Sequence, residues 1–171
     1  MSSGFAGGSE VAPATMRGLD WPCLHQFCVF MENRVGRLHE LLRALERQDL
    51  RVVGLSVVDT VDFAVARLIV NDTDRAREVL TLAGFTMTEN DILGVVLPEA
   101  DQPFEQIFFA LMTAELNISY TYPLLYRYRG RGAVALHVDD VDQAVQILKN
   151  QGHRVITEGD LLCDGDLFGS M

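Results

Sequence analysis

Residues 38–45 read Leu-His-Glu-Leu-Leu-Arg-Ala-Leu, and residues 104–111 read Phe-Glu-Gln-Ile-Phe-Phe-Ala-Leu. In both stretches the apolar side chains stand at positions i, i+3, i+4 and i+7, which form one face of an α-helix. The second stretch begins 66 residues after the first. A recurrence of this kind indicates an internal repeat, in which one structural unit occurs twice along the chain.

A second amphipathic helix recurs in the same order. Its apolar positions are Ala76, Val79, Leu80 and Ala83 in the first copy and Ala144, Ile147 and Leu148 in the second. Each copy follows a run rich in Asp, whose side chains cap the free N–H groups of a helix start. Gly84 and Gly152 end the two helices, because glycine enters the left-handed conformation at little cost. Residues 157–162 also echo residues 88–93, which extends the repeat to a third segment.

Strand-like runs lie between the helices and predict the order βαββαβ in each half. The runs are 26–32, 52–58, 63–70 and 85–88 in the first half, and 92–97, 118–126, 133–138 and 154–157 in the second. Right-handed crossovers put both helices on one face of an antiparallel sheet, a ferredoxin-like arrangement of the α+β class. A unit of about 70 residues leaves its other sheet face in need of cover. We therefore expect the two halves to pack tightly, side by side or face to face.

The predicted boundaries divide the chain into four segments. A flexible leader covers residues 1–22, where no basic start and apolar block mark a secretion signal. The two repeats cover residues 23–90 and 91–164, and a tail covers residues 165–171. No linker rich in Gly, Pro or Ser separates the repeats, which also favours close coupling of the halves.

The composition favours a globular protein and limits its partners. Hydrophobic residues make up 49% of the 171 residues, and the net charge is −10 at pH 7. Such an acidic chain repels phosphate backbones, so we expect no nucleic-acid partner. No apolar run approaches the roughly 20 residues that span a bilayer, so we expect no membrane contact and a cytoplasmic protein. The three cysteines form no CxxC pair, which fits buried or partly buried reduced thiols.

Tyrosines alternate along one predicted strand of the second half. Tyr120, Tyr122, Tyr126 and Tyr128 therefore share one face of the sheet. We interpret this row as an exposed surface that contacts another domain or a second copy of the chain. The alternative interpretation makes it one wall of a ligand site.

A family resemblance enters at residues 30–38, Phe-Met-Glu-Asn-Arg-Val-Gly-Arg-Leu. This stretch resembles the first strand and loop of ACT domains, whose pattern is commonly Glu-Asn-x-Pro-Gly-x-Leu. Residues 115–118, Glu-Leu-Asn-Ile, look like the family's entry into its second strand. The resemblance covers residues 24–163. The layout of the chain as a whole is similar to that of bacterial stand-alone tandem ACT proteins, which are sometimes labelled as related to acetolactate synthase. It implies two ACT-type repeats and a regulatory protein that binds a small amino acid.

The resemblance also implies where a ligand binds. In ACT domains the ligand commonly sits at an interface, between this loop of one domain and strand residues of another. The residues that correspond are Asn33, Arg34, Val35, Gly36 and Leu38 in the loop, and Asn117 and Ile118 on the strand. A glycine at a helix start lets the backbone approach a carboxylate, which the free N–H groups favour. We therefore expect a composite site that pairs the first loop with the second repeat's strand.

The two loops depart from the family pattern to different degrees. Val35 stands where the family usually has proline, whereas Gly36 is kept. The second loop has Asp101 and Gln102 at the aligned Pro-Gly positions, and an aspartate there repels a carboxylate. We expect the first loop to be competent and the second to be degenerate. The alternative is that Asn33 and Gly36 only cap a helix after a turn.

Signatures of enzymes are missing from the sequence. The four histidines have no metal-ligand spacing, and no GxGxxG, GxxxxGK[ST] or GxSxG motif occurs. We predict no catalytic residue, no cofactor and no metal. The leading hypothesis is an allosteric regulatory protein, forming a homodimer or other homo-oligomer, that binds a small or branched-chain amino acid and acts on a regulated enzyme. The alternative is a ligand-free protein-interaction module that uses the tyrosine-bearing strand.

Overall fold

The computed structural model of the protein describes residues 18–163. Its first half has the predicted order of elements. They are β1 (Leu24–Glu32), α1 (Arg37–Glu46), β2 (Val52–Asp59), β3 (Phe63–Val70), α2 (Thr73–Leu82) and the start of β4 (Thr86–Val96). The second half continues with the rest of β4, α3 (Pro103–Thr113), β5 (Ile118–Tyr128), β6 (Arg131–Val138), α4 (Val141–Asn150) and β7 (Val155–Ile156). A short helix, α5 (Glu158–Leu162), follows β7.

Strand β4 belongs to both halves, which corrects the prediction of two strands at 85–88 and 92–97. Its first part pairs with β1, from Phe30↔Thr86 to Leu24↔Ile92. Its last part pairs with β6, from Leu93↔Leu136 to Val96↔Ala133. The backbone finds a hydrogen-bonding partner along the whole segment, so no turn is needed between the repeats. The predicted boundary between residues 90 and 91 thus falls inside a continuous strand.

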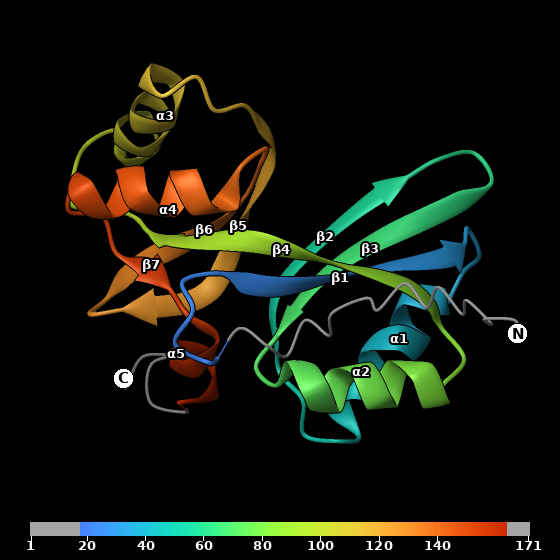
Figure 1. Ribbon diagram of the computed structural model, residues 1–171. Coiled ribbons are helices and arrows are strands. Elements are labelled where there is room, and N and C mark those ends of the chain that lie inside the picture. Colours follow the sequence, from blue (N-terminus) through green and yellow to red (C-terminus); the bar gives the residue numbers. More distant parts are fainter. Residues whose placement is uncertain (1–17, 164–171) are drawn as a thin grey trace, which may run out of the picture.

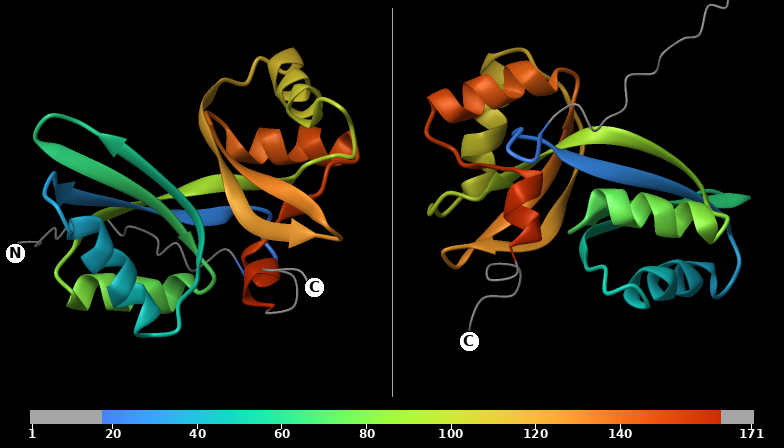
Figure 2. Two further views of the ribbon diagram at one scale, coloured as in Figure 1. Left: turned by 180° about the vertical axis from the view of Figure 1, so that it is seen from behind. Right: turned by 60° about the horizontal axis from the view of Figure 1, so that its bottom comes forward.

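All strand pairs are antiparallel, and together they make one sheet rather than two separate ones. The order is β1-β3-β2-β5-β6-β4-β7, and an additional pairing of β1 with β4 closes six of the strands into a ring. The ring has its weakest strand pairing between β2 and β5, which share the single residue pair Gly54↔Leu124. Helices α1 and α2 cover the outside of the first half, and α3 and α4 cover the outside of the second (Figures 1 and 2).

Three hydrophobic cores result from this arrangement. Two of them lie between each pair of helices and its part of the sheet, as the helix stripes predict. The third lies where the inner sheet faces of the two halves meet, and it includes Val53 and Ile69 from the first half and Leu124 from the second. The halves therefore pack face to face, and burial of these inner faces provides the cover that a small repeat lacks.

The tyrosine row is part of this third core, so the expectation of an exposed row is wrong. Tyr122 and Tyr126 are buried, with 6% and 1% of their surface exposed. Tyr120 and Tyr128 pack against the same core from its margins. Of the contacts proposed for the row, the one between the two halves is correct, because the open inner face of the first half accepts the rings.

The echo between residues 88–93 and 157–162 does not extend to their structure. Residues 88–93 lie in β4, whereas α5 begins at Glu158. Thr157 caps α5, because its side chain accepts the N–H of Asp160 while the Asp160 carboxylate accepts the N–H of Thr157. The second repeat therefore ends in a helix where the first continues as a strand.

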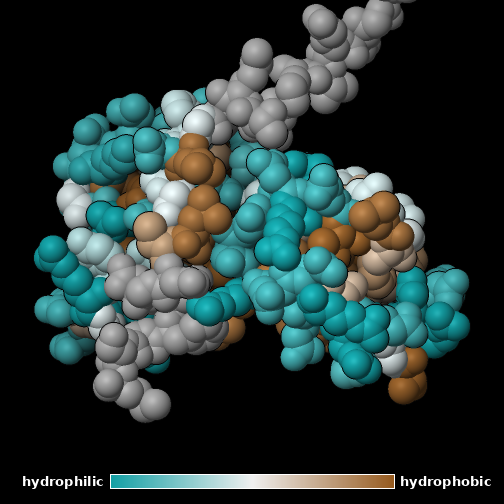
Figure 3. Space-filling view, turned by 90° about the horizontal axis from the view of Figure 1, so that it is seen from below, coloured by the Kyte–Doolittle hydropathy of each residue, from teal (hydrophilic) through white to brown (hydrophobic). Residues whose placement is uncertain are grey.

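Several smaller features complete the description. Of the cysteines, Cys23 is buried, Cys28 is half-buried and Cys163 is exposed, and all three are free thiols. The side of the molecule that carries α1, α2 and α5 is mostly hydrophilic, with small hydrophobic areas among the polar ones (Figure 3). Between residues 18 and 163, no helix is long and apolar enough to cross a membrane.

Candidate ligand-binding site

The start of α1 differs from the starts of most other helices in the chain. Its N-cap, Gly36, has φ of 91° and provides no side-chain cap, although the Arg37 N–H bonds to the Arg34 carbonyl oxygen at 3.3 Å. Aspartates cap α2 and α4, through Asp72 and Asp140, and Thr157 caps α5. The first N–H groups of α1 therefore have no side-chain acceptor and remain suited to an anion.

The loop before α1 stands on the surface and presents little side-chain cover. Val35 is fully exposed, and the exposed side chain of Arg34 has its Nε 3.7 Å from a Glu32 carboxylate oxygen. Asn33 donates from Nδ2 to Asp59 Oδ1 over 2.8 Å, which ties the loop to the end of β2. Leu38 packs against the core of the first half. The loop thus has little side-chain cover, and the Asn33 side-chain amide already has a partner.

Asn117 and Ile118 lie in the other half. Asn117 is exposed at the end of the connection between α3 and β5, and the half-buried Ile118 begins β5 and packs on the core under α3. The β1–α1 loop is at the end of the first half farthest from this connection (Figures 1 and 2). One chain therefore does not bring the two groups of predicted residues together.

The second repeat has a different helix start. Gln102 is the N-cap of α3 with φ of −125°, it makes no side-chain cap, and Pro103 occupies the first turn. Proline has no N–H group, so this start offers one donor fewer than α1. The degenerate character of this loop stays a prediction. Its N-cap lacks the left-handed glycine that begins α1 in the first repeat.

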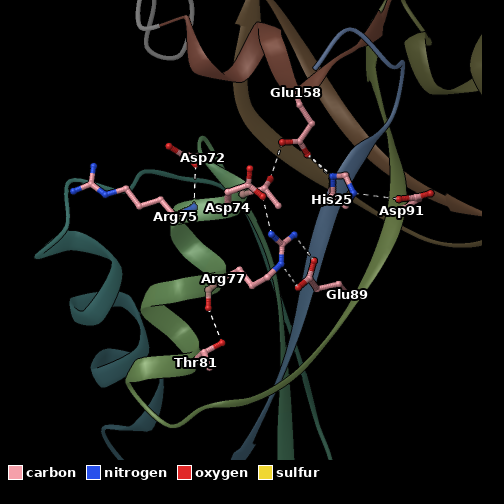
Figure 4. A network of polar contacts seen from close by, with 10 residues as sticks. His25, Asp72, Asp74, Arg75, Arg77, Thr81, Glu89, Asp91 and Glu158 are labelled. Atoms are coloured by element: carbon pink, nitrogen blue, oxygen red, sulfur yellow. Dashed lines mark hydrogen bonds and ion pairs between the residues drawn. The ribbon is translucent and has the colours of Figure 1, made fainter. Parts of the chain in front are cut away.

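A buried polar cluster joins β1, α2 and α5, and none of the residues predicted for the ligand site belongs to it. Glu158 is 8% exposed and accepts hydrogen bonds from the His25 N–H at 2.7 Å and from Thr73 Oγ1 at 2.6 Å. The His25 ring adds a contact from Nδ1 to the same carboxylate at 3.0 Å. The hydrogen bond with Glu158 raises the pKa of His25 against the opposing effect of burial, and the nearby carboxylate of Asp91 contributes (Figure 4).

Arg77 extends the cluster along α2. Its guanidinium binds Glu89 on β4 with two hydrogen bonds of 2.7 and 2.8 Å and Asp74 with one of 2.7 Å (Figure 4). A hollow of about 380 Å³ lies beside these groups, and its lining includes Thr73, Arg77 and Glu158. Arg77 and Glu158 each bind partners on another element, so the cluster serves to fasten β1, α2 and α5 together. In the sequence, Thr157 and Asp160 indicate the start of α5, but they do not indicate the cluster.

The described residues show no metal site. Within residues 18–163, no group of three or more His, Cys, Asp or Glu side chains could hold a metal ion. His153 lies apart from the polar cluster, and partial burial lowers the pKa of its ring.

Comparison with known proteins places these features in a family context. Residues 23–163 match the family model described as an ACT domain pair. Protein BT0572 from Bacteroides thetaiotaomicron has a similar structure, with 24% identity, a TM-score of 0.75, and coverage of 82% of this chain and 96% of that chain. The ligand-free regulatory subunit of aspartate kinase from Thermus thermophilus has 16% identity, a TM-score of 0.53, and coverage of 78% and 95%. These two likenesses concern the fold. The search of curated proteins found no match.

Proposed function

Because the chain belongs to the family of ACT domain pairs, we propose that it is a regulatory protein that binds a small or branched-chain amino acid at the start of α1. The observation that carries this proposal is the uncapped helix start with Gly36 in the left-handed conformation. Its backbone N–H groups and the positive end of the helix dipole would receive the α-carboxylate of the ligand.

A second copy of the chain would complete the site. The loop of one chain offers a single exposed wall, and Asn117 and Ile118 of the same chain lie too far away to face it. In a homo-oligomer, the strand start of one copy can lie against the loop of another, which would supply the polar and apolar contacts that select a side chain. The binding of a ligand would then shift the association of the chains, because the ligand favours the arrangement that forms its complete site.

A regulated enzyme is the corresponding target. The similar structure from Thermus thermophilus is a regulatory subunit of aspartate kinase. By analogy, the present chain would act on a separate catalytic protein, and the ligand would set whether the two proteins associate. The family model that matches the chain describes an ACT domain pair, and it indicates no catalytic family.

The test is a thermal-shift screen of the full chain against the twenty amino acids. A ligand at 100 times its Kd adds about 2.7 kcal/mol to the stability, which raises Tm visibly. Gly36→Asp places a carboxylate at the site and should abolish the response. Gly84→Asp is the matched control, because Gly84 also has a positive φ of 78° and open space around it, but it ends α2. No response to any amino acid, or an equal response in both variants, would refute the site.

A protein-interaction module is the second candidate, and a different surface now supports it. The outer side of α3 exposes Phe104, Phe109 and Met112, whose exposed fractions are 44%, 58% and 62%. A hollow of about 520 Å³ runs from this helix to Ile118. At the positions 66 residues earlier that correspond to Phe109 and Met112, α1 carries Arg43 and Glu46. An apolar face that the other repeat leaves polar is typical of a protein contact.

Sedimentation of wild-type chain and Phe109→Glu separates the uses of this face. A wild-type oligomer that the variant dissociates would mean that a second copy covers α3, in keeping with the regulatory proposal. A monomer that responds to no amino acid would favour the interaction module, with the α3 face free for another protein.

A further inference from the structure

Arg67 occupies an unusual position for a charged residue. It lies on β3, where its neighbours across the sheet are Cys28 of β1 and Ser56 of β2. Its side chain is half-buried and points from the first half toward the second, since its guanidinium carbon lies 3.8 Å from the centre of the Tyr120 ring on β5. A cation thus sits at the contact between the two halves.

No carboxylate in the described part of the chain pairs with this cation. Arg37, Arg77 and Arg154 each bind an aspartate or glutamate at 2.6 to 3.0 Å. Arg67 makes no such contact with any carboxylate among residues 18–163, although the full chain is acidic, with a net charge of −10. A partly desolvated charge without a counter-ion is costly, and stacking on an aromatic ring offsets only part of the loss.

The groups around the guanidinium have unused hydrogen-bonding capacity. Stacking occupies the face of the guanidinium and leaves its N–H groups, which lie in the plane, available to an anion. The Tyr120 hydroxyl accepts a hydrogen bond of 2.8 Å from Gln26 Nε2, and its own proton has no acceptor among residues 18–163. His137 stacks on the same ring at 4.7 Å, and its buried Nδ1 has no partner within that range.

We propose that Arg67 and Tyr120 bind a small carboxylate at the contact between the two halves. The guanidinium would supply two parallel N–H donors, which match the geometry of a carboxylate, and the Tyr120 hydroxyl would supply a third. The bound anion would contact β3 of the first half and β5 of the second. Its binding therefore stabilises the face-to-face packing of the repeats, independently of the site at α1.

The experiment follows the Tm of the full chain at pH 7.5 as sodium acetate replaces sodium chloride at constant ionic strength. Acetate should raise Tm in the wild-type protein and equally in Arg43→Gln, a control on the exposed side of α1. Arg67→Gln should lose the response. Arg67→Lys keeps the charge but lacks the planar fork, so acetate should bind it about tenfold more weakly. This variant keeps the test decisive if Arg67→Gln does not fold.

Two further variants separate the parts of the proposal. Tyr120→Phe keeps the ring under the guanidinium and removes the hydroxyl donor, so the affinity for acetate should fall about tenfold. Gly36→Asp blocks the carboxylate site proposed at α1, and acetate should still raise the Tm of this variant through Arg67. Loss of that response in Gly36→Asp would mean that acetate binds at the start of α1. This result would overturn the present proposal and leave the proposed function unaffected.

Other outcomes also overturn it. No acetate response in the wild-type protein, or an unchanged response in Arg67→Gln, would mean that the stack of Arg67 on Tyr120 only joins the halves. Potassium phosphate serves as a second probe, under the same constant ionic strength. Stabilisation by phosphate without any by acetate would assign the position to a tetrahedral oxyanion and refute the carboxylate.

Discussion

The two repeats share one order of elements but differ at their second strands, β2 and β5. Gly54 on β2 stands 66 residues before Tyr120 on β5, within the segment where the repeat offset holds. A Cβ on Gly54 would lie 2.8 Å from Leu124 Cδ2 and 3.0 Å from Tyr122 Cε2. One repeat thus supplies a position without a side chain, and the other supplies the Leu124 and Tyr122 side chains that cover it. The two repeats pack face to face because the side chains on their inner sheet faces differ and fit one another in size.

The ends of the repeats differ as well. The first ends in β4, which has neighbours on both sides and runs on into the second repeat. The second ends in the two-residue strand β7, which pairs only with β4 within the described residues, and then in α5. The side chain of Glu158, the buried side chain of Leu161 and one backbone hydrogen bond from Gly159 to Leu19 hold α5, whereas paired strands hold β4.

The largest expected effect comes from filling the position without a side chain on β2. Gly54→Val places methyl groups against Leu124 and Tyr122 and should lower the free energy of unfolding by about 3 kcal/mol. Urea unfolding measures the change. Gly132→Val in β6 is the control, because a Cβ there meets only Leu97 at an ordinary 3.8 Å. Equal effects of the two substitutions would contradict the complementarity of β2 and β5.

The next effect concerns the polar contacts that hold α5. Glu158→Gln keeps the shape of the side chain but removes the charge that His25 and Thr73 bind, and should cost about 2 kcal/mol. Glu99→Gln at an exposed position is the control and should change stability by less than about 0.5 kcal/mol. If urea unfolding finds the two variants equally stable, Glu158 does not fasten the end of the second repeat.

Two histidines, one in each half, should give opposite dependences on pH. Bonding to Glu158 raises the pKa of His25, so its stabilising contribution is complete below about pH 6.5 and is lost as the pH rises through the raised value. Burial lowers the pKa of His153, so that residue destabilises the fold as the pH falls below about 6.5. Urea unfolding of His25→Gln and His153→Gln from pH 5.5 to 8.5 checks the signs. Parallel curves for both variants and the wild-type protein would exclude this assignment.

The smallest effect compares the two helix starts that lack a side-chain cap. Gln102→Ser gives α3 a hydroxyl cap and should stabilise the protein by about 0.5 to 1 kcal/mol. Gly36→Ser at α1 should destabilise it, because φ of 91° strains any residue with a Cβ and outweighs the new cap. A gain in both variants, measured by urea unfolding, would show that the two starts have the same backbone requirement.

Several parts of the fold could be predicted from the sequence. The apolar stripes predicted both helices of each repeat. Gly84 and Gly152, predicted to end the second helix of each repeat, follow α2 and α4 with positive φ of 78° and 80°. The match to the ACT domain pair confirms the family resemblance. These successes rest on local periodicity and on the conformations of single residues, which short stretches of sequence fix.

The candidate sites were less accessible to prediction. Gly36 has a positive φ of 91°, which suits both a ligand-binding helix start and a plain helix cap, so the site stays a prediction. The resemblance also gave no sign that Asn117 lies far from Gly36 in the structure. The alternation of tyrosines predicted a shared face correctly and its exposure wrongly. A pattern in one strand tells which side chains share a face, and only the partner sheet decides whether that face is covered.

The sequence by itself determined two βαββαβ repeats, the apolar faces of their four main helices and the net charge of −10. The tertiary structure alone decided that β4 serves both repeats, that the tyrosines lie inside, that no carboxylate among residues 18–163 pairs with Arg67, and that Glu158 meets His25. The last two residues are 133 positions apart. Such contacts depend on how whole sheets pack against each other. The free energy gained by burying apolar surface is a sum over both halves, so no single segment of the sequence determines it.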